Sequence, residues 1–305
     1  MPSQARTLLF IFVSTFAPSA VWFAADPTPY ARPELLVEPA DLAKADPAKP
    51  FVVLDARDRK KYSESRVPGA RWIDAAAWAK AFGQGSDAAG WSRRIGELGI
   101  AQGARVVVYD DVSAKDAARM WWILRYWGVD DARILNGGWR GWTTAKLPVD
   151  MGDSATIQAA VFTAKPIADR LATKDGLMKA LSDKSSGLQI IDARSEGEFC
   201  GTEQQTNKRG GAIPGAKHLE WSDLIDKPTQ RFKPADEIRK LFSGAGIDVA
   251  KPAAAHCQSG GRASVMAFAL ELMGAKDVKN YYASWAEWGN ADDTPIVPGK
   301  PKEKQ

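Results

Sequence analysis

The stretch Phe51-Val-Val-Leu-Asp-Ala-Arg57 recurs in altered form as Leu188-Gln-Ile-Ile-Asp-Ala-Arg194. In both places a short apolar run ends in Asp-Ala-Arg, and this pair allows the rest of the chain to be aligned with itself. Two more landmarks recur in the same order, namely Val67-Pro-Gly-Ala70 as Ile213-Pro-Gly-Ala216 and Gly138-Trp-Arg-Gly-Trp142 as Ser284-Trp-Ala-Glu-Trp288. The chain is therefore predicted to contain two tandem copies of one domain.

The spacing of the landmarks locates an insertion in the second copy. Asp192 follows Asp55 by 137 residues, whereas Trp288 follows Trp142 by 146. The difference places about nine extra residues in the region of residues 200–211. The polar stretch from about residue 144 to residue 165 is the expected link between the copies.

Strands and helices alternate within each copy. In the first copy the β-branched run Val106-Val-Val-Tyr109 is typical of a buried strand, and apolar residues then recur at helical spacing over residues 117–127. In the second copy a strand at residues 253–256 precedes a helix over residues 262–273, which Gly274 ends. This order predicts an α/β fold in which each copy has a mainly parallel sheet with helices on both faces. Such sheets bind ligands at the carboxyl ends of their strands.

Composition excludes several classes of protein. The 305 residues include only two histidines and two cysteines, so neither a His- or Cys-built metal site nor a disulfide framework is expected. The net charge of +4 is scattered along the chain without a basic stripe, which argues against nucleic-acid binding. The 12 tryptophans suggest an aromatic binding face, but Trp121, Trp122 and Trp127 share helical spacing with aliphatic residues, which favours core packing.

The N-terminal segment is typical of an export signal. Arg6 precedes an apolar run from Leu8 to Phe16, and small residues follow at Ala17, Ser19 and Ala20. We assign residues 1–25 to a cleaved signal peptide and expect a periplasmic or secreted protein with no membrane attachment after cleavage. An uncleaved anchor helix is the alternative, which Pro18 and the short apolar run disfavour.

The loop Cys257-Gln-Ser-Gly-Gly-Arg262 carries the strongest chemical signal. It lies where a strand ends and a helix begins, which is a corner that binds anions through backbone N–H groups. The helix dipole and Arg262 both favour the thiolate form of Cys257, which is the nucleophilic form. We find no packing role for Gly260 and Gly261, and we therefore favour a functional cysteine over a buried structural one.

The neighbouring histidine and the first copy limit how this thiol can be activated. His256 precedes Cys257 on a strand and should face the opposite side, which favours packing or hydrogen bonding over general-base catalysis. The first copy has Tyr109-Asp110-Asp111 at this corner, with neither cysteine nor glycine. That copy is expected to have the fold without the thiol, to pack on the second domain and to form a wall of the cleft.

These residues together resemble the tandem form of the rhodanese-type sulfurtransferases. The resemblance covers residues 35–290 and rests on Asp192-Ala-Arg194, Ile213-Pro-Gly-Ala216, the Cys257 loop and Ser284-Trp-Ala-Glu-Trp-Gly289. It implies an inactive rhodanese-like domain at residues 26–150 and a catalytic one at residues 165–295. The implied activity moves a sulfane sulfur from thiosulfate or 3-mercaptopyruvate to a thiophilic acceptor such as cyanide or a thiol, without a metal or other cofactor.

The resemblance also assigns roles to individual residues. Cys257 would carry the sulfur as a persulfide, and Arg194 would bind the anionic donor. The remaining substrate-binding residues would be those whose backbone N–H groups surround the persulfide, namely Gln258, Ser259, Gly260, Gly261 and Arg262. Asp192 is assigned to orienting the loop or Arg194. A monomer is expected.

The donor is less well determined than the reaction. Many tandem members carry a second arginine where this chain has Glu198, and the Cys257 loop matches neither the thiosulfate-preferring nor the mercaptopyruvate-preferring type. Because Arg262 adds a cation, we favour thiosulfate, with 3-mercaptopyruvate as the alternative. Cys200 follows Phe199 in the inserted region, and either a disulfide with Cys257 or plain packing remains open, with packing favoured.

Two rival functions stay open at this point. Phosphatases and arsenate reductases use a similar loop, but with Cys-x5-Arg spacing, whereas Cys257 and Arg262 have Cys-x4-Arg spacing. An exported sulfur carrier or interaction protein without catalytic turnover is the second rival. A carrier would form the persulfide and transfer it slowly to small acceptors.

Overall fold

The fold was analysed in a computed structural model of the chain. It describes residues 29–83, 87–152, 156–183 and 185–300. The predicted signal peptide at residues 1–25 lies outside the described residues. Within the described ranges, no helix has the length and apolar character needed to cross a bilayer.

The first domain is built on a parallel sheet of five strands. Its spatial order is β1-β5-β4-β2-β3, and the strands span Leu36–Val37 (β1), Phe51–Asp55 (β2), Arg71–Trp72 (β3), Arg105–Tyr109 (β4) and Asp131–Leu135 (β5). Six helices accompany them, at Pro39–Ala43 (α1), Arg59–Glu64 (α2), Ala75–Gly83 (α3), Ala88–Glu97 (α4), Lys115–Tyr126 (α5) and Gly138–Thr144 (α6). A short 3-10 turn at Pro33–Leu35 precedes β1.

The second domain repeats this plan with one strand fewer. Its parallel sheet has the order β11-β10-β6-β7, with strands at Gln189–Asp192 (β6), Lys217–His218 (β7), Ala253–His256 (β10) and Val278–Asn280 (β11). The helices are Lys174–Ser182 (α7), Glu196–Cys200 (α8), Ala235–Gly244 (α9), Gly261–Leu272 (α10) and Ser284–Trp288 (α11), and a hairpin joins Ile225–Asp226 (β8) to Arg231–Phe232 (β9). The counterpart of β1 is a single bridge between Leu171 and Asn280.

Each sheet is covered on both faces, as the sequence predicts. Alternate residues of β4 enter different apolar clusters: Val106 and Val108 join one, whereas Val107 and Tyr109 join another. Successive side chains of a strand point to opposite faces, so both faces of the sheet must be covered by helices. The predicted α/β fold with two tandem copies is therefore confirmed.

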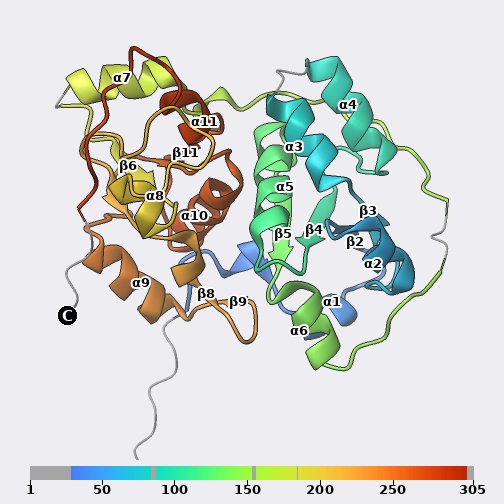
Figure 1. The fold of residues 1–305 in the computed structure, drawn as a ribbon. Helices are drawn as coiled ribbons and strands as arrows, with labels where there is room; N and C mark the ends of the chain where they lie inside the picture. Colours follow the sequence, from blue (N-terminus) through green and yellow to red (C-terminus); the bar gives the residue numbers. More distant parts are fainter. Residues whose placement is uncertain (1–28, 84–86, 153–155, 184, 301–305) are drawn as a thin grey trace, which may run out of the picture.

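The two domains share one apolar core, in which α5 and α10 lie side by side (Figure 1). Trp121 of α5 meets Phe268 of α10 edge to face, with ring centroids 4.9 Å apart. Trp122 stacks on Tyr282 of the second domain at 5.5 Å. The prediction that these tryptophans pack in the core is confirmed, and Trp121 and Trp122 make aromatic contacts across the domain junction.

Segments at the edges of the first domain also join the two halves. Tyr30 donates its hydroxyl to the carbonyl of Lys233 at 2.8 Å, and the amide of Arg32 donates to Leu272 at 3.0 Å. Residues 29–32, which the sequence assigned to the first domain, thus lie against the second. The described parts of the link, residues 145–152 and 156–173, run over the outer side of the first domain before the chain enters α7 (Figure 1).

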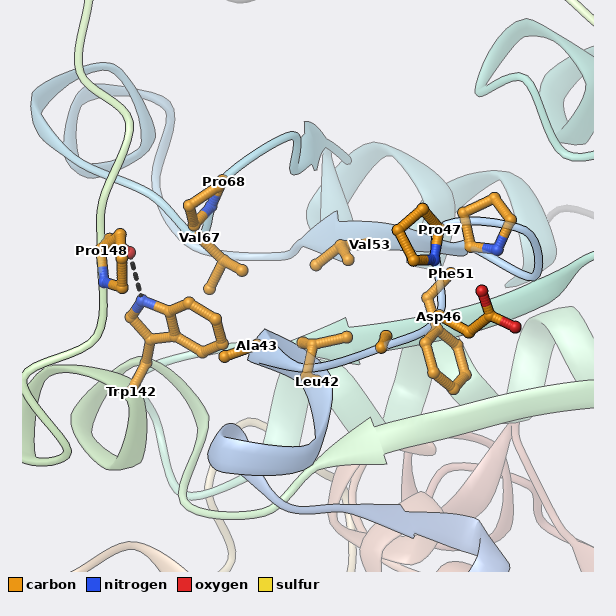
Figure 2. Close-up of a pocket in the computed structure, with 12 residues that line it drawn as sticks. Leu42, Ala43, Asp46, Pro47, Phe51, Val53, Val67, Pro68, Trp142 and Pro148 are labelled. Atoms are coloured by element: carbon orange, nitrogen blue, oxygen red, sulfur yellow. Dashed lines mark hydrogen bonds between the residues drawn. The ribbon is translucent and has the colours of Figure 1, made fainter.

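The copies differ in how one sheet face is covered. Helix α7 has nine residues, but its counterpart α1 has only five. A mainly apolar cavity of about 240 Å³ lies beside the first sheet, lined in part by the end of α1 and the residues that follow it. Figure 2 shows Leu42, Val53, Val67 and Trp142 around this cavity, where the Trp142 indole N–H donates to Pro148 at 2.7 Å.

Candidate active site

The loop between β10 and α10 is held through its carbonyl oxygens. The carbonyls of Cys257 and Gln258 each accept an N–H from the start of α11 at 3.0 Å. The carbonyl of Gly260 accepts from Asn280 Nδ2 at 3.1 Å. These bonds occupy the loop carbonyls and leave the loop amides available to an anion, as in an anion-binding nest.

Gly260 and Gly261 have packing roles that were not expected from the sequence. Gly260 has φ +82°, and a Cβ there would lie 2.6 Å from the ring of Tyr282. A Cβ on Gly261 would lie 2.8 Å from Nε of Arg119, which reaches across from α5. Both glycines therefore allow close packing of the loop as well as its turn, and the prediction that they have no packing role is wrong.

The loop amides are free in the second domain and occupied in the first. Among the described residues, no acceptor is found for the backbone N–H groups of residues 258–263. In the first domain the carboxylate of Asp110 accepts four backbone N–H groups at 2.8–3.1 Å, those of Val112, Ala114, Asp116 and Ala117. Burial raises the pKa of Asp110 to about 6.

Strand register shows that Asp110 and Cys257 occupy equivalent positions. Tyr109 pairs with Asp55 in the first sheet, as His256 pairs with Asp192 in the second. Both loops then end on a residue of positive φ that caps a helix of 12 residues. The corner of the first domain therefore carries its own anion where the second has a thiol, so the second copy can take a negative charge from a ligand or from a persulfide.

A cavity of about 570 Å³ opens at this loop, between the two domains. Five predicted site residues line it: Cys257, Gln258, Ser259, Gly261 and Arg262. The remaining lining residues are Trp221 and six residues of the first domain, Ala75, Ala76 and Ala79 on α3 and Lys115, Asp116 and Arg119 on α5. The prediction that the first copy forms a wall of the cleft is confirmed.

The individual first-domain residues of the site were not predicted from the sequence. The first turn of α5 follows the end of β4, at the corner that corresponds to the Cys257 loop. This position at the end of a strand could be predicted from the sequence. What the sequence does not show is that α5 packs against α10 and so turns that corner toward Cys257.

Arg262 lies at the cavity with its charge already paired. Its Nη1 and Nη2 donate to the two oxygens of Glu198 at 2.5 and 2.8 Å. Burial lowers the pKa of Arg262, but the hydrogen bond to Glu198 and the electrostatic interactions with Cys257 and Glu198 outweigh it, and the pKa is raised overall. Glu198 thus neutralises much of the positive charge with which we expected Arg262 to bind the donor.

The structure corrects the prediction for Arg194. Its side chain is only 1 % exposed, it is paired with Asp192 at 2.6 Å, and it does not line the cavity. Arg57 of the first domain pairs with Asp55 at the same 2.6 Å, and each guanidinium lies 4.1 Å from the centre of a tryptophan ring. Because the copy without a thiol makes the same contacts, we assign Arg194 to the structure of the Asp-Ala-Arg turn. Asp192 therefore orients Arg194.

His256 is fully buried behind the loop. Its Nε2 lies 3.5 Å from Asp192, and neither ring nitrogen has a hydrogen-bond partner among the described residues. Burial lowers its pKa to about 4, so the ring is neutral near pH 7. It does not line the cavity, which agrees with a packing role.

Cys200 and Cys257 are both free thiols. Cys200 ends α8 and is partly exposed, and burial raises its pKa, which disfavours the reactive thiolate. The inserted region that follows Cys200 contacts the active loop through Asn207 instead. The side-chain amides of Asn207 and Gln258 exchange two hydrogen bonds, at 2.9 and 3.1 Å. The insertion therefore steadies the loop beside Cys257.

Comparison with known families agrees with this geometry. The family described as rhodanese-like domain matches residues 38–145 and again residues 173–291. This chain belongs to the rhodanese family. The two matches correspond to the two sheets and place the Cys257 loop within the second.

Curated relatives of this rhodanese are sulfurtransferases. It is 31% identical over 269 residues to thiosulfate sulfurtransferase of Pseudomonas aeruginosa, covering 86% of this chain and 96% of the relative. It is 33% identical over 206 residues to 3-mercaptopyruvate sulfurtransferase of Escherichia coli K12, covering 67% and 72%. These relatives support sulfurtransferase activity for this rhodanese.

Solved structures show the same fold. SseA from Escherichia coli, described as a 3-mercaptopyruvate sulfotransferase, superimposes with a TM-score of 0.70 at 28% identity. The match covers 83% of this rhodanese and 99% of that chain. YnjE superimposes with a TM-score of 0.76 at 26% identity, covering 89% of this rhodanese and 70% of YnjE.

Proposed function

We propose that this rhodanese transfers a sulfane sulfur from thiosulfate to cyanide or a thiol through a persulfide on Cys257. The observation that carries the proposal is that the backbone N–H groups of the Cys257 loop have no acceptor among the described residues. The corresponding N–H groups of the first domain bind the Asp110 carboxylate. Amides that bind a carboxylate in one copy are suited to a persulfide anion in the other, because both place negative charge at a helix start.

The proposed reaction has two balanced steps. The Cys257 thiolate attacks the outer sulfur of thiosulfate, a new S–S bond forms, and sulfite leaves with the electron pair of the broken S–S bond. Cyanide or a thiolate then attacks the outer sulfur of the persulfide, and the Cys257 thiolate leaves. The loop amides stabilise the charge on sulfur in both steps, and the buried His256 takes no part.

The charges around the cavity favour a small anionic donor. Lys115, Arg119 and Arg262 line it together with Asp116. Glu198 pairs with Arg262 and Asp116 lies 4.0 Å from Lys115, so these groups leave one net positive charge at the cavity. Thiosulfate is a compact dianion, and 3-mercaptopyruvate carries a carboxylate, so both suit this lining. Thiosulfate is the donor that we propose, and 3-mercaptopyruvate is the alternative.

The mass of the Cys257 peptide tests the proposal. Thiosulfate should add one sulfur atom to this peptide, and cyanide should remove it as thiocyanate. Cys257→Ser should abolish both reactions, and Cys200→Ser is the matched control that should retain them. Thiocyanate formation by Cys257→Ser at the wild-type rate would overturn the mechanism.

Two further readouts decide the donor and the remaining rival. The ratio of kcat/KM for thiosulfate to that for 3-mercaptopyruvate assigns the donor. A persulfide that forms fully but reaches cyanide only slowly would support a sulfur carrier instead of an enzyme.

We also propose that the protein is exported and acts as a monomer in the periplasm or outside the cell. The support is the sequence pattern of residues 1–25. N-terminal sequencing of protein recovered from the periplasm tests the first point, and a start at Met1 would contradict it. Light scattering of the purified protein tests the second, and the mass of a dimer would contradict it.

A further inference from the structure

We propose that Arg119, from the domain that lacks the thiol, binds the anionic group of the sulfur donor. This inference rests on the proposed function and adds a substrate-binding residue to it. It gives the first domain a direct part in the choice of donor, in addition to its role as a wall of the cleft.

The charge around the cavity singles out Arg119. Arg262 is held by both oxygens of Glu198 at 2.5 and 2.8 Å. Lys115 lies 4.0 Å from Asp116. Arg194 is buried against Asp192 and does not reach the cavity. Arg119 has no carboxylate within 4.0 Å in the described part of the chain, so its positive charge is not paired.

The position of Arg119 places this charge beside the reactive loop. Its Nε and Cζ lie 2.8 and 2.9 Å from where a Cβ of Gly261 would stand. Gly261 is the first residue of α10 and belongs to the group of amides without an acceptor. The guanidinium and these amides thus face the same part of the cavity, so one anion can bind both.

Arg119 is also held in place before a donor arrives. Its neighbours Ala118 and Met120 are fully buried, and its guanidinium lies 5.7 Å from the centre of the Tyr282 ring. Its Nε is shielded from solvent and has no hydrogen-bond partner among the described residues. Nε is therefore packed against the loop, and this fixes the orientation of the guanidinium. Its Nη groups are the N–H donors left for an anion in the cavity, which Arg119 lines.

Steady-state kinetics of Arg119→Gln test the inference. Loss of one charge-assisted hydrogen bond should lower kcat/KM for thiosulfate about tenfold to a hundredfold, mainly through KM. The value of kcat/KM for cyanide should stay close to wild type, because cyanide reacts after sulfite has left. With methanethiosulfonate, a donor of the same kind with one negative charge fewer, the loss should be smaller.

Two further variants separate binding from folding. Lys80→Gln removes one exposed charge from α3, outside the cavity, and is the matched control that should leave both kcat/KM values unchanged. Arg119→Lys should recover part of the lost affinity for thiosulfate, because it restores the charge without the planar fork.

The outcomes distinguish this inference from the proposed function. If wild-type protein transfers sulfur from thiosulfate but Arg119→Gln does so with unchanged KM, Arg119 does not bind the donor and the proposed function stands. Equal losses for thiosulfate, methanethiosulfonate and cyanide would mean that Arg119 only supports the domain junction. If wild-type protein forms no persulfide, the proposed function itself fails.

Discussion

The ion pair between Glu198 and Arg262 links the stability of the second domain to its affinity for the donor. Glu198 is 3 % exposed and accepts two hydrogen bonds from Arg262, whose side chain is 22 % exposed. Glu198→Gln keeps the shape of the side chain and can still cap α8 with Ser195, because glutamine also serves in a capping box. The substitution therefore removes the charge with little other change.

We expect this change to lower stability and to improve donor binding. Breaking a fully buried pair costs about 3–5 kcal/mol, and the partial exposure of Arg262 reduces this to about 2–4 kcal/mol. In a protein of this size the melting temperature should fall by about 3–7 °C. The freed charge of Arg262 should lower KM for thiosulfate about two- to fivefold, the effect of one partly solvated ion pair.

The stability difference should depend on pH in a defined direction. Burial raises the pKa of Glu198, but the hydrogen bonds from Arg262 outweigh it and leave the pKa below its ordinary value. A carboxyl with a lowered folded pKa stabilises the protein above its unfolded pKa of about 4.3, and this stabilisation is lost as pH falls through the folded pKa. The gap between wild type and Glu198→Gln should therefore narrow in acid.

Denaturant titrations at neutral pH and in acid, together with thiosulfate kinetics, measure both effects. Glu203→Gln is the control, because Glu203 also contacts Ser195, at 3.0 Å, but is exposed and does not pair with Arg262. It should change stability by less than about 0.5 kcal/mol. The reasoning is refuted if Glu198→Gln is as stable as wild type and has the same KM for thiosulfate.

Two further predictions concern buried groups beside the loops. Asp110→Asn should lower the free energy of unfolding by about 2–4 kcal/mol, because its amide nitrogen would face backbone N–H groups that now bind a carboxylate oxygen; denaturant titration that detects no loss would contradict this. The pKa of His256 is lowered to about 4, so between about pH 6.5 and pH 4 the unfolded chain binds a proton that the folded chain does not. Stability should fall by up to about 3 kcal/mol as pH drops through this window, and His256→Gln should remove that slope without loss of sulfur transfer. Unfolding curves across the window decide, and an equal slope in both proteins would disprove the assignment.

The repeat and the reactive loop could be predicted from the sequence because short stretches of consecutive residues determine both. Apolar runs that end in Asp-Ala-Arg mark β2 and β6, and the sheets built on them have the same strand order. The position of Cys257 between a strand and a helix follows from the same local pattern. The burial of Trp121 and Trp122 follows from helical spacing on α5.

The roles of the charged residues could not be predicted in this way, because they depend on contacts between distant parts of the chain. Glu198 and Arg262 are 64 residues apart, and only the packing of α8 beside the loop shows that they neutralise each other. The Asp-Ala-Arg motif suggested a donor-binding role for Arg194, but the matching contacts of Arg57 in the first domain reveal a structural one.

The sequence by itself determined that one fold occurs twice and that one cysteine lies at an anion-binding corner, since strands, turns and helix starts are encoded locally. Tertiary structure alone decided which charges face that cysteine. Packing of α5 on α10 brings Arg119 to Gly261 across the domain junction, and the strand register places Asp110 where the second domain has Cys257. Electrostatic interactions act through space, so the set of charges at the site is fixed only when the two domains are packed together.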